Sequence, residues 1–275
     1  MGGQPKHGSG SRIVTNSLDL EGQCTIVWGG AAGIGEATSR LLASRGAKVV
    51  IVGRKPEAGD ALAEELCGEG LNAASVAGDV MSEESIIRVV DAANELFGTP
   101  SLSANIIGTA GFCDLLAMET QVWDDQLALN LRPMFLIGRT MVRRLKDEGK
   151  RGSLVFTGSI GGEQGAARHA AYGAAKAGMV ALAKSMAVEW RKLGIRVNCV
   201  SPGPIATPRI TPSDEMNALF ERKLPAGRFG TPEEVAETIA FALSDAANFI
   251  NGQNIIVDGG WMAVPPISAD DNPNL

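Results

Sequence analysis

The sequence predicts an α/β fold built as one doubly wound, mostly parallel sheet of seven strands. Short apolar runs alternate with helical stretches along most of the 275 residues. The first apolar run leads through a glycine-rich turn into a helix and then a second apolar run. With 45% hydrophobic residues and no internal linker, the chain can bury one large core.

The first three elements form a βαβ unit. Residues 24–28 are an apolar strand, residues 36–45 a helix and residues 48–52 the next strand. The remaining elements are expected, in order, as helix 57–69, strand 74–77, helix 83–97, strand 102–107, one long helix 123–146, a strand of residues 154–158, a helix ending near residue 193, strand 195–200, an irregular polar segment to residue 230, helix 233–244 and strand 254–257.

The turn inside the first unit predicts a dinucleotide site. Its pattern is Gly29-x-x-x-Gly33-Ile34-Gly35. Glycines let the backbone approach a pyrophosphate, and the following helix offers free N–H groups and a partial positive charge. A lone glycine triplet would be read as a simple turn, but the flanking strand, helix and strand favour a Rossmann-type nucleotide site.

Tyr172, the only tyrosine, lies four residues before Lys176. Side chains at this spacing share one face of a helix, and a nearby ammonium should lower the pKa of the phenol. Ser159 follows the apolar run 154–158, so its hydroxyl should emerge at the carboxyl end of that strand. An accidental pair remains possible for Tyr172 and Lys176 alone, but the dinucleotide turn favours acid/base chemistry.

Charge and composition argue against several other classes. The net charge is −6, the isoelectric point is about 5.1 and the longest basic run is Arg143-Arg144, which disfavours nucleic acid as a partner. No apolar stretch is long enough to predict a membrane span. Cys24, Cys67, Cys113 and Cys199 are widely spaced and are expected to be thiols of a cytoplasmic protein.

No metal site is expected, because His7 and His169 complete no recognisable ligand set. Residues 1–17 have no apolar signal segment and are interpreted as a flexible N-terminal arm. The predicted folded domain spans residues 18–263, and residues 264–275 form a C-terminal tail.

Over residues 18–263 the chain resembles the short-chain dehydrogenase/reductase family. The resemblance rests on motifs in the expected order: the glycine turn at 29–35, Asp79-Val80, Ala110-Gly111, Asn130, Ser159, Tyr172-Gly-Ala-Ala-Lys176, Asn198, Pro202-Gly203, Thr207 and Asp258-Gly-Gly. It implies a catalytic tetrad of Asn130, Ser159, Tyr172 and Lys176. Tyr172 would be the general acid or base, Ser159 would bind the substrate oxygen, Lys176 would also hold the nicotinamide ribose, and Asn130 would bend its helix and keep a relay water.

The cofactor is expected to be NADP, with NAD as the alternative. Folds that prefer NAD place a carboxylate after the second strand, whereas here Gly53 is followed by Arg54 and Lys55. A guanidinium suits a 2′-phosphate, although Arg54 could also stack on adenine or face solvent. The predicted cofactor-binding residues are Gly29, Gly33, Ile34, Gly35, Arg54, Lys55, Asp79, Val80, Thr109, Ala110, Gly111, Tyr172, Lys176, Pro202, Gly203, Ile205 and Thr207.

Two positions depart from the family pattern. Trp28 stands where threonine is usual, and Gly108 stands where asparagine is usual. One hypothesis is an exchange of volume in which the indole packs over Gly108; the alternative is that Trp28 faces the other way.

The expected substrate is a secondary alcohol or ketone of moderate size, cyclic and aromatic ones included. The predicted pocket walls are residues 112–114, 161–169 and 204–229, which carry few fixed charges. A 3-oxoacyl thioester reductase is the nearest alternative, and a non-catalytic dinucleotide-binding protein is the alternative from another class. The resemblance also implies a homo-oligomer, expected to be a tetramer. The apolar stretches 134–137 and 179–182 of two expected helices favour such an assembly, although ordinary core packing would explain many of these residues.

Overall fold

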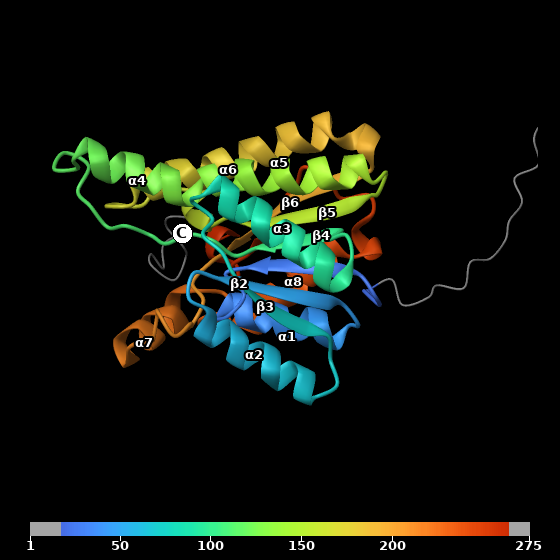
Figure 1. Cartoon of the computed structure of the whole chain (residues 1–275). Helices are drawn as coiled ribbons and strands as arrows, with labels where there is room; N and C mark the ends of the chain where they lie inside the picture. The colour runs from blue at the N-terminus through green and yellow to red at the C-terminus, as the bar shows by residue number, and fades with distance from the viewer. Residues whose placement is uncertain (1–17, 264–275) are drawn as a thin grey trace, which may run out of the picture.

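A computed structural model describes residues 18–263, and the predicted arm 1–17 and tail 264–275 lie outside this range. Its sheet has seven parallel strands in the order β3-β2-β1-β4-β5-β6-β7 (Figure 1). The strand order reverses between β1 and β4, which is where ligands bind in open α/β sheets. The strands are β1 Cys24–Trp28, β2 Lys48–Gly53, β3 Ala73–Ala77, β4 Leu102–Asn105, β5 Gly152–Thr157, β6 Ile195–Pro202 and β7 Asn254–Val257.

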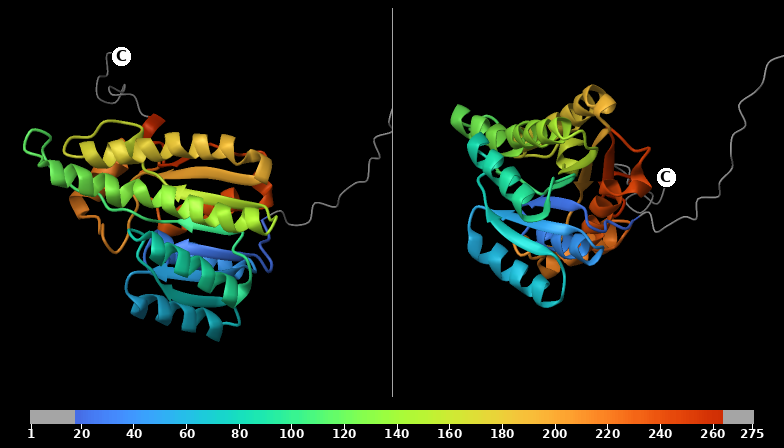
Figure 2. Two further views of the ribbon diagram at one scale, coloured as in Figure 1. Left: turned by 45° about the horizontal axis from the view of Figure 1, so that its top comes forward. Right: turned by 45° about the vertical axis from the view of Figure 1, so that its right-hand side comes forward.

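Helices cover both faces of the sheet, as the two further views show (Figure 2). One core contains residues of α3, α5 and α6, and the other contains residues of α1, α2 and α8. The helices are α1 Ile34–Ser44, α2 Pro56–Gly68, α3 Glu83–Phe97, α4 Thr120–Asn130, α5 Arg132–Asp147, α6 Ala170–Glu189, α7 Asp214–Lys223 and α8 Pro232–Leu243. The doubly wound α/β prediction is therefore confirmed.

Strand β1 illustrates why the central strands are apolar throughout. Ile26 and Trp28 contribute to the core under α3 and α5, whereas Val27 contributes to the core under α1 and α8. Successive side chains alternate between the two faces, and both faces are covered, so every residue of β1 is buried.

The predicted long helix 123–146 is wrong, because the structure has two helices, α4 and α5, that meet at Leu131. Pro133 has no N–H to donate to the preceding turn, so the hydrogen-bonding ladder is interrupted there. The Asn130 side-chain amide donates instead to the carbonyl of Gln126 at 3.0 Å.

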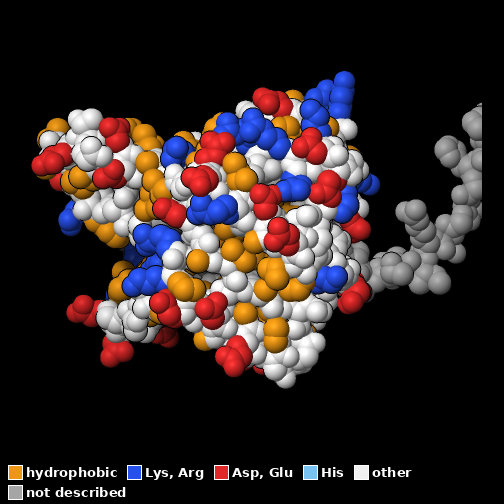
Figure 3. Space-filling model, viewed as in Figure 1, with side chains coloured by type: hydrophobic (Ala, Val, Ile, Leu, Met, Phe, Trp, Pro, Cys, Tyr) orange, Lys and Arg blue, Asp and Glu red, His pale blue; other side chains and the backbone are white. Residues whose placement is uncertain are grey.

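The expected irregular segment up to residue 230 is also wrong in part, because it contains helix α7. Ser213 caps this helix by accepting a hydrogen bond from the Met216 amide. Helix α4 follows β4 and helix α7 follows β6, so both belong to connections at the carboxyl ends of strands. The space-filling view shows the ends of these helices as two lobes with a recess between them (Figure 3).

Candidate active site

The four predicted catalytic residues come from three neighbouring elements. Asn130 is the last residue of α4, Ser159 lies two residues after β5, and Tyr172 and Lys176 lie in the first two turns of α6. Lys176 is only 2% exposed. Its Nζ donates to the carbonyl oxygen of Thr157 at 2.7 Å and to that of Ile107 at 3.2 Å, so it joins the carboxyl ends of β4 and β5.

Ser159 and Tyr172 lie side by side above these strands. The Ser159 hydroxyl accepts a hydrogen bond from the Gly161 amide at 3.0 Å, which fixes its direction at the start of a short 3-10 turn, Ile160–Gly162. A Cβ built on Gly161 would lie 3.5 Å from the Tyr172 ring, so this turn packs directly against the phenol. The two hydroxyl groups can therefore reach the same substrate oxygen.

The structure does not show the expected lowering of the Tyr172 pKa by Lys176. Burial raises the pKa of Tyr172 above its ordinary value, and hydrogen bonding by the Ser159 hydroxyl opposes that rise. The Lys176 ammonium lies 5.7 Å from the centre of the Tyr172 ring and is directed to two carbonyl groups. Burial also lowers the pKa of Lys176 to about 8, which weakens the cation that was expected to act on the phenol.

Asn130 anchors the loop that follows β4. Its Oδ1 accepts from the Thr109 amide at 3.1 Å, and its Nδ2 donates to the Thr109 carbonyl at 3.2 Å. Gln126, one turn earlier on α4, accepts from the Gly111 amide at 3.2 Å. Gln126 was missed in the sequence, where the only available signal was its spacing of four residues from Asn130.

Gly108 has a local reason to be glycine. Its φ is +122°, and a Cβ there would lie 2.3 Å from Asn130 Oδ1 and 3.2 Å from Lys176 Nζ. These polar groups take up the space beside Gly108, whereas Trp28 belongs to the apolar core under α3 and α5. The hypothesis that the indole fills space left by Gly108 is therefore not supported.

The glycine turn forms a close-fitting cradle at the start of α1. A Cβ on Gly29 would lie 2.3 Å from the Ile106 carbonyl oxygen, and one on Gly35 would lie 1.9 Å from the Gly29 carbonyl oxygen. Gly33 precedes α1 with φ +54° and supplies no side-chain cap, which leaves the helix N-terminus available to an anion. Thr207 approaches this turn, since a Cβ on Gly33 would lie 3.5 Å from it.

The other predicted cofactor residues lie around this cradle at the carboxyl ends of the strands. Arg54 and Lys55 are exposed after β2, and within residues 18–263 neither side chain forms an ion pair or hydrogen bond. Asp79 follows β3, and its amide donates to the Ser85 hydroxyl at 2.9 Å. The rest are placed as follows: Val80 next to Asp79, Ala110 in the loop held by α4, Pro202 at the end of β6, Gly203 directly after it, and Ile205 buried in the core under α1 and α8.

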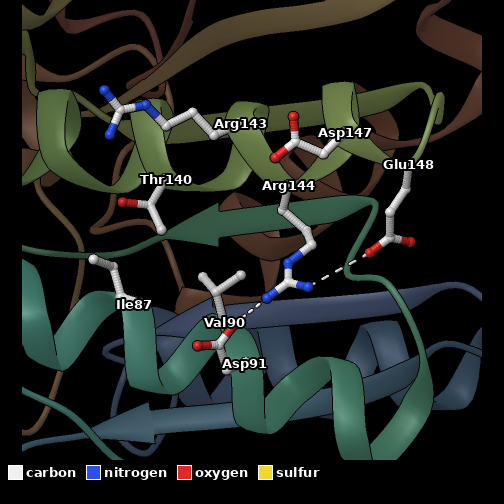
Figure 4. Close-up of a pocket in the computed structure, with 8 residues that line it drawn as sticks. All are labelled: Ile87, Val90, Asp91, Thr140, Arg143, Arg144, Asp147 and Glu148. Carbon is white, nitrogen blue, oxygen red and sulfur yellow. Dashed lines mark hydrogen bonds and ion pairs between the residues drawn. The ribbon is translucent and has the colours of Figure 1, made fainter.

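A separate hollow of about 360 Å³ lies between α3 and α5 (Figure 4). Arg144 spans it, with ion pairs to Asp91 and Glu148. Its lining contains none of the predicted site residues. Among the described residues, no group of three or more His, Cys, Asp or Glu could hold a metal, and no helix is long and apolar enough to cross a membrane.

Comparisons with known proteins agree with this arrangement. Residues 29–262 match the family model described as enoyl-(acyl carrier protein) reductase. The chain is 40% identical to cis-4-hydroxycyclohexanecarboxylate dehydrogenase of Sinomonas cyclohexanicum over 245 residues, covering 87% of this chain and 96% of the relative. It is 35% identical to a 3-oxoacyl-[acyl-carrier-protein] reductase of Vibrio cholerae over 248 residues, covering 90% of this chain and 100% of the relative.

The chain is also similar to a sugar-alcohol dehydrogenase and to a protein of known crystal structure. D-threitol dehydrogenase of Mycolicibacterium smegmatis is 34% identical over 245 residues, covering 88% of this chain and 94% of the relative. The crystal structure of a putative gluconate dehydrogenase from Agrobacterium tumefaciens superposes with a TM-score of 0.85 at 33% identity, covering 90% of this chain and 99% of that chain.

Proposed function

Because the chain belongs to the short-chain dehydrogenase/reductase family, we propose that Tyr172 is the general acid or base of its NAD(P)-dependent oxidation of a secondary alcohol or reduction of a ketone. The observation that carries this assignment is the convergence of Ser159, Tyr172 and Lys176 at the carboxyl ends of β4 and β5. A non-catalytic dinucleotide-binding protein would have no need to keep all three groups in this arrangement.

Each residue has a distinct task in this proposal. Ser159 and Tyr172 hold the substrate oxygen, and Tyr172 donates the proton to it in ketone reduction or accepts it in alcohol oxidation. Lys176 stands at the end of two strands and would bind the nicotinamide ribose. Asn130 keeps the loop of residues 108–111 on α4. The nicotinamide supplies or accepts the hydride, and no metal is required.

NADP is the proposed cofactor, with NAD as the alternative. The glycine cradle and the uncapped start of α1 suit a pyrophosphate. Arg54 supports NADP because its exposed guanidinium has no partner within residues 18–263 and follows the strand that meets the adenosine ribose in such folds. A 2′-phosphate would give it a bidentate, charge-assisted partner.

The proposed substrates are secondary alcohols and ketones of moderate size, cyclic and aromatic ones included. The relatives named above include dehydrogenases of a hydroxycyclohexane carboxylate and of a sugar alcohol. Reduction of a 3-oxoacyl thioester stays the second candidate, because another relative carries that activity in its name. We also propose that the protein is a homotetramer and that it acts in the cytoplasm.

Replacement of Tyr172 by Phe tests the central assignment. The change removes only the phenolic hydroxyl, which carries the transferable proton, so turnover should fall by about 100- to 10,000-fold while the dissociation constant for NADPH stays within about threefold. Ketone-dependent oxidation of NADPH would be followed by absorbance, and cofactor binding by fluorescence. A variant that keeps more than about a tenth of wild-type turnover, with chemistry rate-limiting, would overturn the assignment of Tyr172.

A further inference from the structure

Two aromatic side chains from distant parts of the sequence meet beside the catalytic phenol. Phe112 lies in the loop after β4, and His169 is the residue before α6. Their ring centres are 4.3 Å apart with an interplanar angle of 77°, which is an edge-to-face contact. The centre of the His169 ring is also 6.1 Å from that of Tyr172.

The backbone holds this pair in place at some cost. Arg168 has φ +64°, the only positive φ of a non-glycine residue among those described. Its carbonyl accepts a hydrogen bond from the Cys113 amide at 2.9 Å, which ties the loop carrying Phe112 to the segment carrying His169. Uncommon backbone conformations that persist often mark functional sites. In this protein, the backbone conformation of Arg168 places the imidazole of His169 beside the ring of Tyr172.

The hydrogen bonding of His169 determines which nitrogen is free. Its Nδ1 lies 3.2 Å from the carbonyl oxygen of Ala167. A carbonyl can only accept, so the neutral ring carries its proton on Nδ1 and presents Nε2 as an acceptor. Within residues 18–263, Nε2 has no hydrogen-bonding partner.

We propose that Phe112 and His169 form a specificity wall that selects a cyclic secondary alcohol or ketone bearing a second polar group. This inference rests on the proposed function. The reacting oxygen would be held by Ser159 and Tyr172, the apolar ring of the substrate would cover Phe112, which is 64% exposed, and a second hydroxyl of the substrate would donate a hydrogen bond to Nε2 of His169.

A ring suits this wall for an entropic reason. It keeps the second polar group at a fixed distance from the reacting carbon, so both ends can be bound without freezing rotatable bonds. An open chain with the same two groups would lose that advantage. A long acyl thioester would gain little from Nε2, since its bulk is a flexible apolar chain or a carrier.

The experiment compares cyclohexanol, cyclohexane-1,4-diol and the open-chain hexane-2,5-diol as substrates of the full chain. The wild-type protein should give its highest kcat/KM with cyclohexane-1,4-diol. In His169→Phe, which keeps a ring but removes Nε2, the ratio of kcat/KM for cyclohexane-1,4-diol to that for cyclohexanol should fall by about 3- to 12-fold, as for a lost hydrogen bond between neutral groups. The loss should fall mainly on KM.

Two further variants separate the aromatic contact from the hydrogen bond. Phe112→Ala should lower the ratio of cyclic to open-chain substrate, whereas Phe249→Ala, a fully exposed phenylalanine in the loop before β7, should not. His169→Gln, which restores a polar atom near Nε2, should recover part of the selectivity. It also serves as the test if His169→Phe does not fold, as judged by its affinity for NADPH.

The outcomes distinguish this inference from the function on which it rests. If the wild-type protein oxidises several of these alcohols but His169→Phe changes their ratios by less than about threefold, the wall is wrong and the function stands. A wild-type preference for 3-oxobutyryl thioester over every cyclic substrate also overturns the wall. If no alcohol or ketone is turned over with NADP or NAD, the proposed function itself fails.

Discussion

Lys176 is the residue whose environment differs most from what its spacing suggested. The helical spacing predicted that the Lys176 ammonium lies beside the phenol of Tyr172. Instead, the ammonium donates hydrogen bonds to the carbonyl groups of Thr157 and Ile107. Burial lowers its pKa to about 8, and burial raises the pKa of Tyr172. Both shifts disfavour the charged forms of these two side chains. A low pKa of the phenol therefore requires more than the pair itself.

The free energy of unfolding should depend on pH because Lys176 is buried. Its pKa in the folded state, about 8, lies below the ordinary value of 10.5, so only the unfolded chain holds the proton between these values. The free energy of unfolding should therefore rise as the pH increases from 8 to 10.5, by an amount on the order of 3 kcal/mol from this group. Lys176→Met should lack that rise and be more stable than the wild type near pH 7.

Urea unfolding of both proteins at several pH values would measure this effect as a difference. Burial raises the pKa of Cys24 and Cys199 to about 12, so these thiols act in the opposite direction above pH 9. Cys199 interacts electrostatically with Lys176, so both proteins would also carry Cys199→Ala, and the difference between the two curves then reports the lysine. Equal slopes from pH 8 to 10.5 would contradict the predicted state of Lys176.

Arg54 determines the cofactor preference in our proposal. Arg54→Ala should weaken NADP binding by about 1.5 to 3 kcal/mol, the range for hydrogen bonds to charged groups, and should change NAD binding little. Dissociation constants for both cofactors would be measured by fluorescence titration. Arg143→Ala, an exposed arginine of α5, is the matched control for loss of one surface charge. Equal losses for NADP and NAD would remove the reason to prefer NADP.

Helix α4 acts as a clamp on the loop that follows β4. Gln126 and Asn130 lie one turn apart, and together they bind the backbone of Thr109 and Gly111. The break at Leu131 ends α4 at the position where Asn130 can turn toward this loop. The interruption between α4 and α5 is thus part of how the site is built.

Gln126→Leu should weaken cofactor binding while leaving the fold intact. The leucine fills a similar volume but leaves the Gly111 amide without its acceptor, which should cost about 1 kcal/mol and raise the dissociation constant for NADPH about fivefold. Gln126→Glu keeps an acceptor oxygen and should remain within about twofold of the wild type. Gln121→Leu, on the exposed side of α4, is the control. If both leucine variants bind NADPH alike, the clamp has no role in binding.

At the scale of the whole molecule, most of the apolar residues that suggested an assembly belong to the protein's own core. In the segment 134–137 of α5, only Phe135 is exposed, at 44%. On α6, Met179 is buried, but Val188 is 62% exposed. The surface available for a subunit contact on these two helices is therefore narrower than their sequences suggested.

The assembly prediction can be tested on these two positions. The wild type should be a homo-oligomer at micromolar concentration, and Phe135→Glu with Val188→Asp should give a species of lower mass by light scattering. A desolvated carboxylate in a subunit contact is costly, whereas the same change on a free surface is nearly neutral. Leu96→Asp, an exposed position on α3, is the control. A stable wild-type monomer would contradict the assembly and leave the chemistry untouched.

The sequence by itself determined the doubly wound sheet, because local patterns carry that information. Buried parallel strands need continuous apolar runs such as residues 24–28, and the turn at Gly29 to Gly35 needs residues without a Cβ. For the same reason Tyr172, Lys176 and Ser159 could be proposed as one group, since a helical spacing and a strand end place them without knowledge of distant contacts, while their roles came from the family resemblance.

Only the tertiary structure determined the partners of the polar side chains and the positions of the loops. The direction of Lys176, the clamp by Gln126 and the meeting of Phe112 with His169 each join segments far apart in sequence. Helix α7 was missed because its residues are mostly polar and give weak periodicity, and the break at Leu131 was missed because an apolar helical pattern continues across it. Hydrophobic periodicity encodes which face of an element is buried, whereas the partner of a polar group depends on elements that only folding brings together.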